Sequence, residues 1–283
     1  METGRPFTTE EITTKIDTKE HIHPYKKLSI QVGLNGLSFC ILDTIGHKVL
    51  LSDKVDFKTA STPYLMLKAL KSLVNTHKLT AHRFSEVNVV HKNHLYCLVP
   101  KTLFDKKELA NYLKFNTKIL ACDHIVYDVL PHQELVCVYV PFTNINNYIF
   151  DCFGAFEFKH NSAVLLQSML HQKNNKLTCY VHVGKRTMEL LVFEKKTLQL
   201  YNQFDYKTKE DFLYYILFTY EQLGLPAEEV KLKLFGSIEE DDRLFAICYQ
   251  YIKKVVVFIP KNPPYAQEEL EGSSIDLTLL SSI

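Results

Sequence analysis

Two short turns that contain glycine hold the residue types in this sequence best suited to binding a phosphate. They span residues 33–36 and 184–187, and a further glycine, Gly236, follows a later apolar run. Glycine lets backbone N–H groups approach a phosphate closely, and lysine or arginine can contact its oxygens. The candidate cofactor-binding residues are Gly33, Asn35, Gly36, Gly184, Lys185, Arg186, Thr187 and Gly236. The alternative is that the glycines only turn two hairpins and that the basic pair is solvated.

No other group of residues predicts a catalytic or metal site. His21 and His23 lie in a polar segment, and His91 and His94 flank a predicted hairpin turn. Neither pair has a cysteine or acidic cluster at zinc spacing, so we expect solvated loops and no metal. The sequence has no phosphate-binding GxxxxGK[ST], no GxSxG and no HExxH motif. We therefore predict no catalytic residues.

The composition favours a soluble cytoplasmic protein. Hydrophobic residues make up 46% of 283 residues, and the formal charge is +1, which excludes a global field for nucleic acid. No apolar run approaches the roughly 18 residues of a membrane helix, so we expect no membrane insertion. The seven cysteines are odd in number and lack C-x-x-C spacing, as is typical of reduced thiols. The first residues do not resemble a signal peptide.

The two candidate turns belong to a pattern that occurs twice. Each copy reads strand, tight turn, strand, turn, strand and amphipathic helix. The predicted strands cover 28–32, 39–43 and 49–57 in the first copy, and 177–183, 188–193 and 198–206 in the second. Thr62 and Thr208 are the expected helix N-caps. Asn35-Gly36 predicts a type I′ turn, in which both central residues have φ > 0.

The repeat divides the chain into four parts. We expect a polar N-terminal arm over 1–25, a first lobe over 26–173, a second lobe over 174–260 and a flexible tail over 261–283. The first lobe contains an insertion over about 86–153, with a hairpin, a short helix and further strands. Residues 174–176 are the predicted hinge. The aromatic helix over 208–223 is either buried on two sides or a surface for a partner.

Two βββα halves joined by a hinge resemble the actin-like, ribonuclease H-like ATPase superfamily. The run LVPKTLFDKKELANYLKFN, followed by DHIVYDVL, resembles the small extra subdomain of the bacterial pilus-assembly protein PilM. GLSFCILD, together with LQLYNQFDYKTKEDFLYYILFTYEQLGL, is similar to an uncharacterised bacterial family, domain of unknown function 3822. The resemblance implies an α/β fold: a two-lobed actin-like duplication with a small α+β insertion in the first lobe.

The resemblance also implies where nucleotide chemistry would lie. Superfamily hairpins carry Asp-x-Gly, whose aspartate orients magnesium-bound water. The matching positions here are Gln31 and His182, and neither side chain can act as an anionic partner of magnesium. The double-glycine adenosine motif corresponds to Phe235-Gly236-Ser237, with one glycine retained.

An actin-like frame without these acids favours a non-catalytic scaffold or adaptor, a pseudo-ATPase with a degenerate nucleotide cleft. The alternative is an ATP-binding protein or weak ATPase that uses the cleft between the lobes without a clear magnesium site. The PilM-like insertion suggests a protein partner, a peptide or cytoplasmic tail bound by that insertion.

Overall fold

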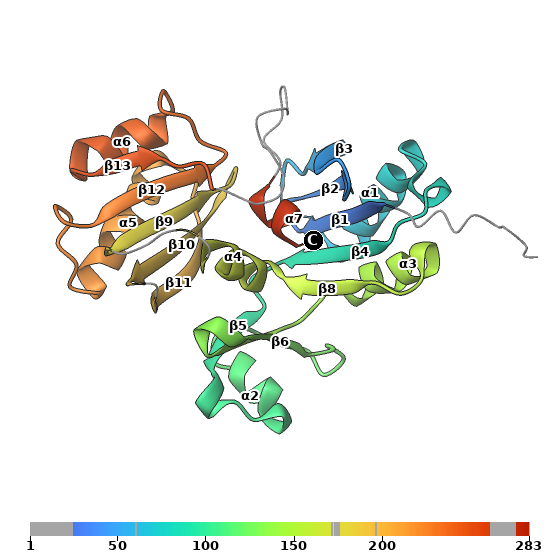
Figure 1. The fold of residues 1–283 in the computed structure, drawn as a ribbon. Helices are drawn as coiled ribbons and strands as arrows, with labels where there is room; N and C mark the ends of the chain where they lie inside the picture. Colours follow the sequence, from blue (N-terminus) through green and yellow to red (C-terminus); the bar gives the residue numbers. More distant parts are fainter. Residues whose placement is uncertain are drawn as a thin grey trace, which may run out of the picture.

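A computed structural model describes residues 25–59, 61–170, 172, 176–195, 197–260 and 276–282. These residues form two α/β lobes side by side, with a smaller third part projecting from the first lobe (Figure 1). The expected N-terminal arm up to residue 24, and residues 174 and 175 of the expected hinge, lie outside the described residues.

Each lobe is built on a five-stranded sheet, and the strand order is the same in both. The first is β3-β2-β1-β4-β8 and the second is β11-β10-β9-β12-β13. In each, three antiparallel strands are followed by two parallel ones. The strands are β1 Lys26–Gly33, β2 Gly36–Asp43, β3 Lys48–Asp56, β4 Glu86–Lys92 and β8 Glu157–His160, then β9 Thr178–Val183, β10 Thr187–Glu194, β11 Thr197–Asp205, β12 Lys231–Gly236 and β13 Val255–Val257. The predicted duplication is confirmed.

Helices cover the outer face of each sheet, and two further helices lie between the lobes. The outer helices are α1 Pro63–Thr76 and α3 Thr143–Phe153 on the first lobe, and α5 Lys209–Gln222 and α6 Arg243–Tyr251 on the second. Both predicted caps are present, because Thr62 accepts from the Leu65 backbone N–H and Thr208 forms a capping box with Asp211. Short 3-10 turns cover Leu79–Ala81 and Pro131–Gln133.

Two helices that are far apart in the sequence meet between the lobes. α4 (Asn161–Leu170) follows β8, and α7 (Leu277–Ser281) lies near the end of the chain; the two are in contact. α4 is buried on nearly all sides and shares a core cluster with Tyr180 and Leu191 of the second lobe. α7 lies on β1 and β2 of the first lobe, where Leu280 packs with Cys40. Both helices therefore connect the two sheets.

The flexible tail predicted over 261–283 is wrong for residues 276–282. These residues form α7, and all four residues from Leu277 to Leu280 are buried. Because α7 covers the inner face of the first sheet, its apolar side chains gain more by burial than the segment loses in chain entropy. Residues 261–275 lie outside the described part of the chain.

The insertion is narrower than the predicted range of 86–153. β4 is a central strand of the first sheet, and α3 places Ile145 and Ile149 in the core of that lobe. The inserted part is a three-stranded sheet in the order β5-β7-β6 with one short helix. Its elements are β5 Tyr96–Pro100, 3-10 turns Lys101–Leu103 and Lys106–Glu108, α2 Leu109–Leu113, β6 Val126–Leu130 and β7 Leu135–Tyr139.

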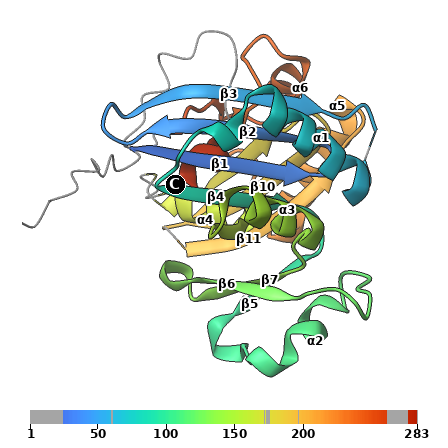
Figure 2. The same ribbon diagram turned by 90° about the vertical axis from the view of Figure 1, so that its right-hand side faces the viewer.

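Both faces of the insertion sheet are covered by other elements. One face packs on α2 through Val136 and Val138, and the other shares a cluster with α4 through Cys137 and Tyr139. α2 lies at the end farthest from the two lobes (Figures 1 and 2). The insertion is therefore an ordered extension of the body whose far end projects away from it.

Candidate functional site: the cleft between the lobes

The turns singled out in the sequence face each other across a cleft of about 1310 Å³ between the lobes. Residues 33–36 join β1 to β2, and residues 184–187 join β9 to β10. All eight predicted residues line this cleft, and Gly236 among them ends β12. The cleft is larger than the roughly 300–1,000 Å³ typical of small-molecule sites, so a nucleotide-sized ligand would fit.

The first turn differs from the prediction in its backbone geometry. Gly33 pairs with Gly36, so the two loop residues are Leu34 and Asn35, and neither Asn35 nor Gly36 has positive φ. Gly36 is required for a different reason, because a Cβ there would meet the Val55 carbonyl oxygen at 2.7 Å. Gly236 has a φ of +95°, which favours glycine. A Cβ at this position would also meet the Val183 carbonyl oxygen at 2.6 Å.

The predicted basic pair contacts the opposite lobe. Lys185 Nζ lies 3.3 Å from Asp56 Oδ2 at the end of β3, and the lysine side chain is 71% exposed. The Arg186 guanidinium donates to the backbone carbonyls of Phe57, at 2.9 Å, and Lys58. A ligand phosphate would therefore have to compete with contacts between the lobes for both side chains.

The cleft lining carries more positive than negative charge. Seven basic side chains face four aspartates: Lys54, Lys92, Lys185, Arg186, Lys207, Lys209 and Arg243 against Asp53, Asp56, Asp242 and Asp276. This excess favours an anionic ligand over a cationic one. In the described part of the chain, no group of three or more His, Cys, Asp or Glu side chains could hold a metal ion.

Gln31 and His182, which the resemblance predicted to stand in place of magnesium-orienting aspartates, are engaged with other protein groups. The Gln31 amide donates to Asn161 Oδ1 at 3.2 Å and to Thr278 Oγ1 at 2.5 Å. His182 Nδ1 lies 2.9 Å from Glu189 Oε2, and its other ring nitrogen lies 3.7 Å from Asp276 Oδ1. Both side chains are buried and are hydrogen-bonded to other protein groups.

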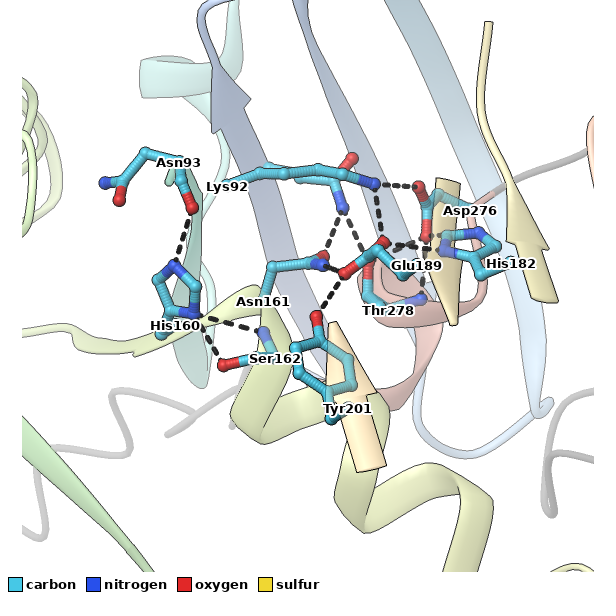
Figure 3. Close-up of polar contacts among 11 residues, drawn as sticks. Lys92, Asn93, His160, Asn161, Ser162, His182, Glu189, Tyr201, Asp276 and Thr278 are labelled. Atoms are coloured by element: carbon cyan, nitrogen blue, oxygen red, sulfur yellow. Dashed lines mark hydrogen bonds and ion pairs between the residues drawn. The ribbon is translucent and has the colours of Figure 1, made fainter. Parts of the chain in front are cut away.

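Glu189 is the centre of a buried network of side chains from both lobes, from α4 and from the segment before α7 (Figure 3). Lys92 Nζ of the first lobe lies 3.0 Å from Glu189 Oε2 of the second lobe. The other carboxylate oxygen accepts from Asn161 Nδ2 at 2.5 Å and from Tyr201 OH at 2.6 Å. Asp276, just before α7, lies 3.9 Å from Lys92. We call Lys92, Glu189, His182, Asp276, Asn161 and Tyr201 the interlobe network.

The charges of this network stabilise one another. Burial opposes ionisation of Glu189, but Lys92 and then His182 and Tyr201 outweigh it, so the pKa of Glu189 is lowered. Burial likewise disfavours the charged Lys92, yet the Glu189 and Asp276 carboxylates leave its pKa raised. The pKa of Asp276 is lowered against burial by His182 and Lys92. The charged side chains of Lys92, Glu189 and Asp276 therefore stabilise one another within the network.

Sequence reasoning missed Lys92, Glu189 and Asp276. A signal existed for two of them. Glu189 is an acid inside the apolar strand β10, and Lys92 ends β4, whose carboxyl end meets that of β1 at one edge of the sheet. Asp276 gave no signal, because the tail around it is acidic and rich in serine.

The remaining predicted features have mixed outcomes, and one of them, His94, lines the cleft. His91 is buried and lies 2.9 Å from Asn146 Oδ1, so the solvated loop predicted for it is wrong, while His94 is exposed. His21 and His23 lie outside the described residues. On α5, Phe212 and Tyr220 are buried and Tyr214 is 58% exposed, so the aromatic helix is covered on one side only.

With this geometry established, the family of the chain follows from comparison. A family model described as a protein of unknown function (DUF3822) matches residues 15–255. The chain belongs to the DUF3822 family. The predicted resemblance is confirmed, and the matched range includes both lobes and the insertion. No curated protein matches this DUF3822 chain.

Solved structures similar to this DUF3822 protein share its fold. A Bacteroides thetaiotaomicron VPI-5482 protein with actin-like ATPase fold and unknown function has a TM-score of 0.75 and 21% identity, covering 92% of this chain and 97% of that one. A PilM–PilN type IV pilus biogenesis complex gives a TM-score of 0.54 and 10% identity, covering 84% and 89%. These likenesses establish the two-lobed actin-like fold. Among the described residues, no helix has the length and apolarity to cross a membrane.

Proposed function

We propose that this DUF3822 protein is a non-catalytic actin-like adaptor whose two lobes are joined by its own side chains. The observation that carries the proposal is the engagement of Gln31 and His182, at the two positions where superfamily carboxylates act, by neighbouring protein groups. A carboxamide and a histidine paired with Glu189 cannot orient magnesium-bound water as two free aspartates would. The actin-like fold would then serve to bind a partner.

Titration with a fluorescent ATP analogue, with and without magnesium, tests this. We expect either no binding or weak binding that is indifferent to magnesium, and no release of phosphate. Arg186→Ala serves as a cleft variant and Arg83→Ala, outside the cleft, as its control. Tight, magnesium-dependent binding with turnover would overturn the proposal.

The alternative is an ATP-binding protein, and the size and positive lining of the cleft favour it over other enzymes. In that case nucleotide affinity would depend on Lys185 and Arg186 more than on magnesium. Lys185→Ala would then weaken binding, by roughly tenfold for one charge-assisted contact. A variant affinity equal to that of the parent would remove this alternative.

We propose that the partner is a protein, recognised as an extended peptide by the insertion. The likeness to a PilM–PilN complex supports a protein partner. In the insertion sheet, β5 and β6 are the end strands, and end strands accept an added strand. Val129 on β6 is 46% exposed and so available for contact. Tyr96 on β5 stacks on His160 and contacts the ring of Tyr201.

Pull-down from a native extract tests the insertion as the binding module. Val129→Lys places a charge on the edge strand, which blocks strand addition. Ile259→Lys is the matched control, since Ile259 is also exposed but lies in the second lobe. We expect a partner that the parent and the Ile259 variant retain and the Val129 variant loses. Equal capture by all three would exclude this edge.

A further inference from the structure

The far end of the insertion presents apolar side chains to solvent. Phe115 is 82% exposed, Leu103 is 70% exposed and Leu120 is 59% exposed. Phe115 has the largest exposed fraction of any large apolar residue in the described part of the chain. Leu103 precedes α2 in the chain and Phe115 and Leu120 follow it, and α2 lies at the end of the molecule farthest from the two lobes (Figures 1 and 2). We call residues 101–120 the insertion tip.

The insertion tip is also basic. It holds five lysines and only two carboxylates, a formal charge of +3, whereas the whole chain carries +1. Both carboxylates have local partners, since Asp105 accepts from the Lys107 backbone N–H at 2.9 Å and Glu108 accepts from Asn111. The lysines are Lys101, Lys106, Lys107, Lys114 and Lys118. Among them only Lys101 has a carboxylate, Glu134 at 3.9 Å, within ion-pair reach in the described residues.

The apolar residues of the tip are held in position by the turns behind them. Tyr112 OH donates to the Leu103 carbonyl at 2.8 Å and accepts from the Asp105 N–H at 2.7 Å. The Tyr112 ring stacks on Phe104, which also contacts Tyr127. Phe115 lies three residues beyond Tyr112, and Lys114 Nζ is 5.9 Å from its ring centre. Hydrogen bonds and ring contacts therefore hold the turns of the tip in place, and a lysine lies beside its most exposed apolar ring.

We infer that the insertion tip docks onto an anionic lipid surface. Lysines beside exposed Phe and Leu are the combination that binds the boundary between lipid headgroups and acyl chains. α2 lies at the end of the molecule farthest from the two lobes, so a flat lipid surface can reach the tip (Figures 1 and 2). This docking is independent of the cleft and of the edge of β6.

Co-sedimentation of the full chain with vesicles tests the inference. We expect binding to phosphatidylglycerol–phosphatidylcholine vesicles that weakens with salt, and no binding to pure phosphatidylcholine. Replacing Lys107, Lys114 and Lys118 by Gln should reduce affinity roughly a hundredfold, from the per-lysine attraction of an anionic surface. Phe115→Ser should reduce it roughly tenfold. Phe150→Ser, on α3 and 60% exposed, is the matched control and should bind as the parent does.

The absence of tryptophan from the sequence provides a second readout. Phe115→Trp introduces a single tryptophan whose emission should shift to the blue, and be quenched by brominated lipid, on anionic vesicles. Phe150→Trp should do neither. Vesicle binding without this difference would overturn the inference. So would a failure to bind anionic vesicles, or binding to soluble polyglutamate that equals vesicle binding and is unaffected by Phe115→Ser, which would assign the tip to an acidic protein.

Discussion

Glu189 and Asp56 form two lysine–carboxylate pairs that cross between the same lobes in different surroundings. Glu189 is 1% exposed and has four polar partners, whereas Asp56 is 48% exposed and pairs with a lysine that is mostly in water. An ion pair in water contributes little, because solvent screens it and both side chains lose freedom. Removing one partner of a buried pair leaves a charge that burial disfavours. The two pairs therefore form an internal comparison.

We predict that Lys92→Met destabilises the protein by about 3–5 kcal/mol, the usual effect of leaving a buried charge without its partner. Lys185→Ala, which removes the exposed pair, should cost less than about 1 kcal/mol. Chemical unfolding followed by circular dichroism measures both. Adding Glu189→Gln to Lys92→Met should recover part of the loss, since the glutamine remains a hydrogen-bonding partner without the charge. Equal losses for both single variants would refute the role assigned to Glu189.

The pH dependence of stability follows from the pKa directions in the network. The pKa of Glu189 is lowered in the folded protein, so its contribution is present above the ordinary glutamate value of about 4.3 and is lost as pH falls through the folded value. The pKa of Lys92 is raised, so its contribution is present below about 10.4 and is lost as pH rises through the folded value.

We therefore expect the difference in unfolding free energy between the parent and the Lys92→Met/Glu189→Gln variant to be constant between about pH 5 and pH 10. It should shrink only at more acidic or more alkaline pH. Unfolding curves for both proteins across a pH series provide the measurement. A loss of this difference between pH 5 and pH 10 would contradict the prediction, since neither Glu189 nor Lys92 would then control it.

At the scale of elements, α7 is a short helix that covers part of the first sheet. Leu279 and Leu280 form a cluster with Cys40 and Leu42, and Ser282 is hydrogen-bonded to Ser29 at 2.6 Å. Without α7 this part of the inner face of the sheet would be exposed to the cleft. Cys40 is completely buried, and burial raises the pKa of its thiol, so in the folded protein it is unreactive.

We predict that truncation after residue 275 makes Cys40 reactive toward a thiol reagent. The measurement uses a background in which the more accessible Cys97, Cys122 and Cys152 are serine. Cys179, buried in the outer core of the second lobe, is the control and should stay protected. Labelling of Cys179 together with Cys40 would indicate global unfolding, and protection of both would show that α7 is dispensable for covering the sheet.

The elements that the sequence predicted best are those whose pattern is local. Alternating apolar residues located the strands, and Thr62 and Thr208 located two helix starts, because a strand face or a cap is decided within a few residues. The boundaries of the insertion are not decided by nearby residues. β4 pairs with β1 across more than fifty residues, and the order of strands cannot be read from the strand itself.

The eight cleft residues were predictable for a related reason. They lie in turns that the duplication places at corresponding positions, so recognising the repeat brought both hairpins together. The interlobe network was not predictable, because its members come from β4, α4, β9, β10, β11 and the segment before α7. Only the packing of both lobes against α4 and α7 brings these side chains within hydrogen-bond distance.

At the scale of the molecule, three kinds of contact join the lobes without any ligand. They are the interlobe network, the contact between α4 and α7, and the bonds of Arg186 and Lys185 to residues 56–58. A protein that relied on a nucleotide to bridge its lobes would close when the nucleotide binds. Here the charged side chains that join the lobes are already paired with one another. A ligand would therefore bring the lobes little closer together.

We therefore predict that the radius of gyration in solution is the same with and without magnesium ATP. Small-angle X-ray scattering measures it directly. Lys92→Met should give a larger radius, since Glu189 and Asp276 lose the cation that draws the first lobe toward them, while Lys185→Ala should leave the radius unchanged. Contraction of the parent protein on adding magnesium ATP would show that nucleotide bridges the lobes. That result would replace the adaptor with the ATP-binding alternative, because a ligand shifts a conformation only by binding one state more tightly than the other.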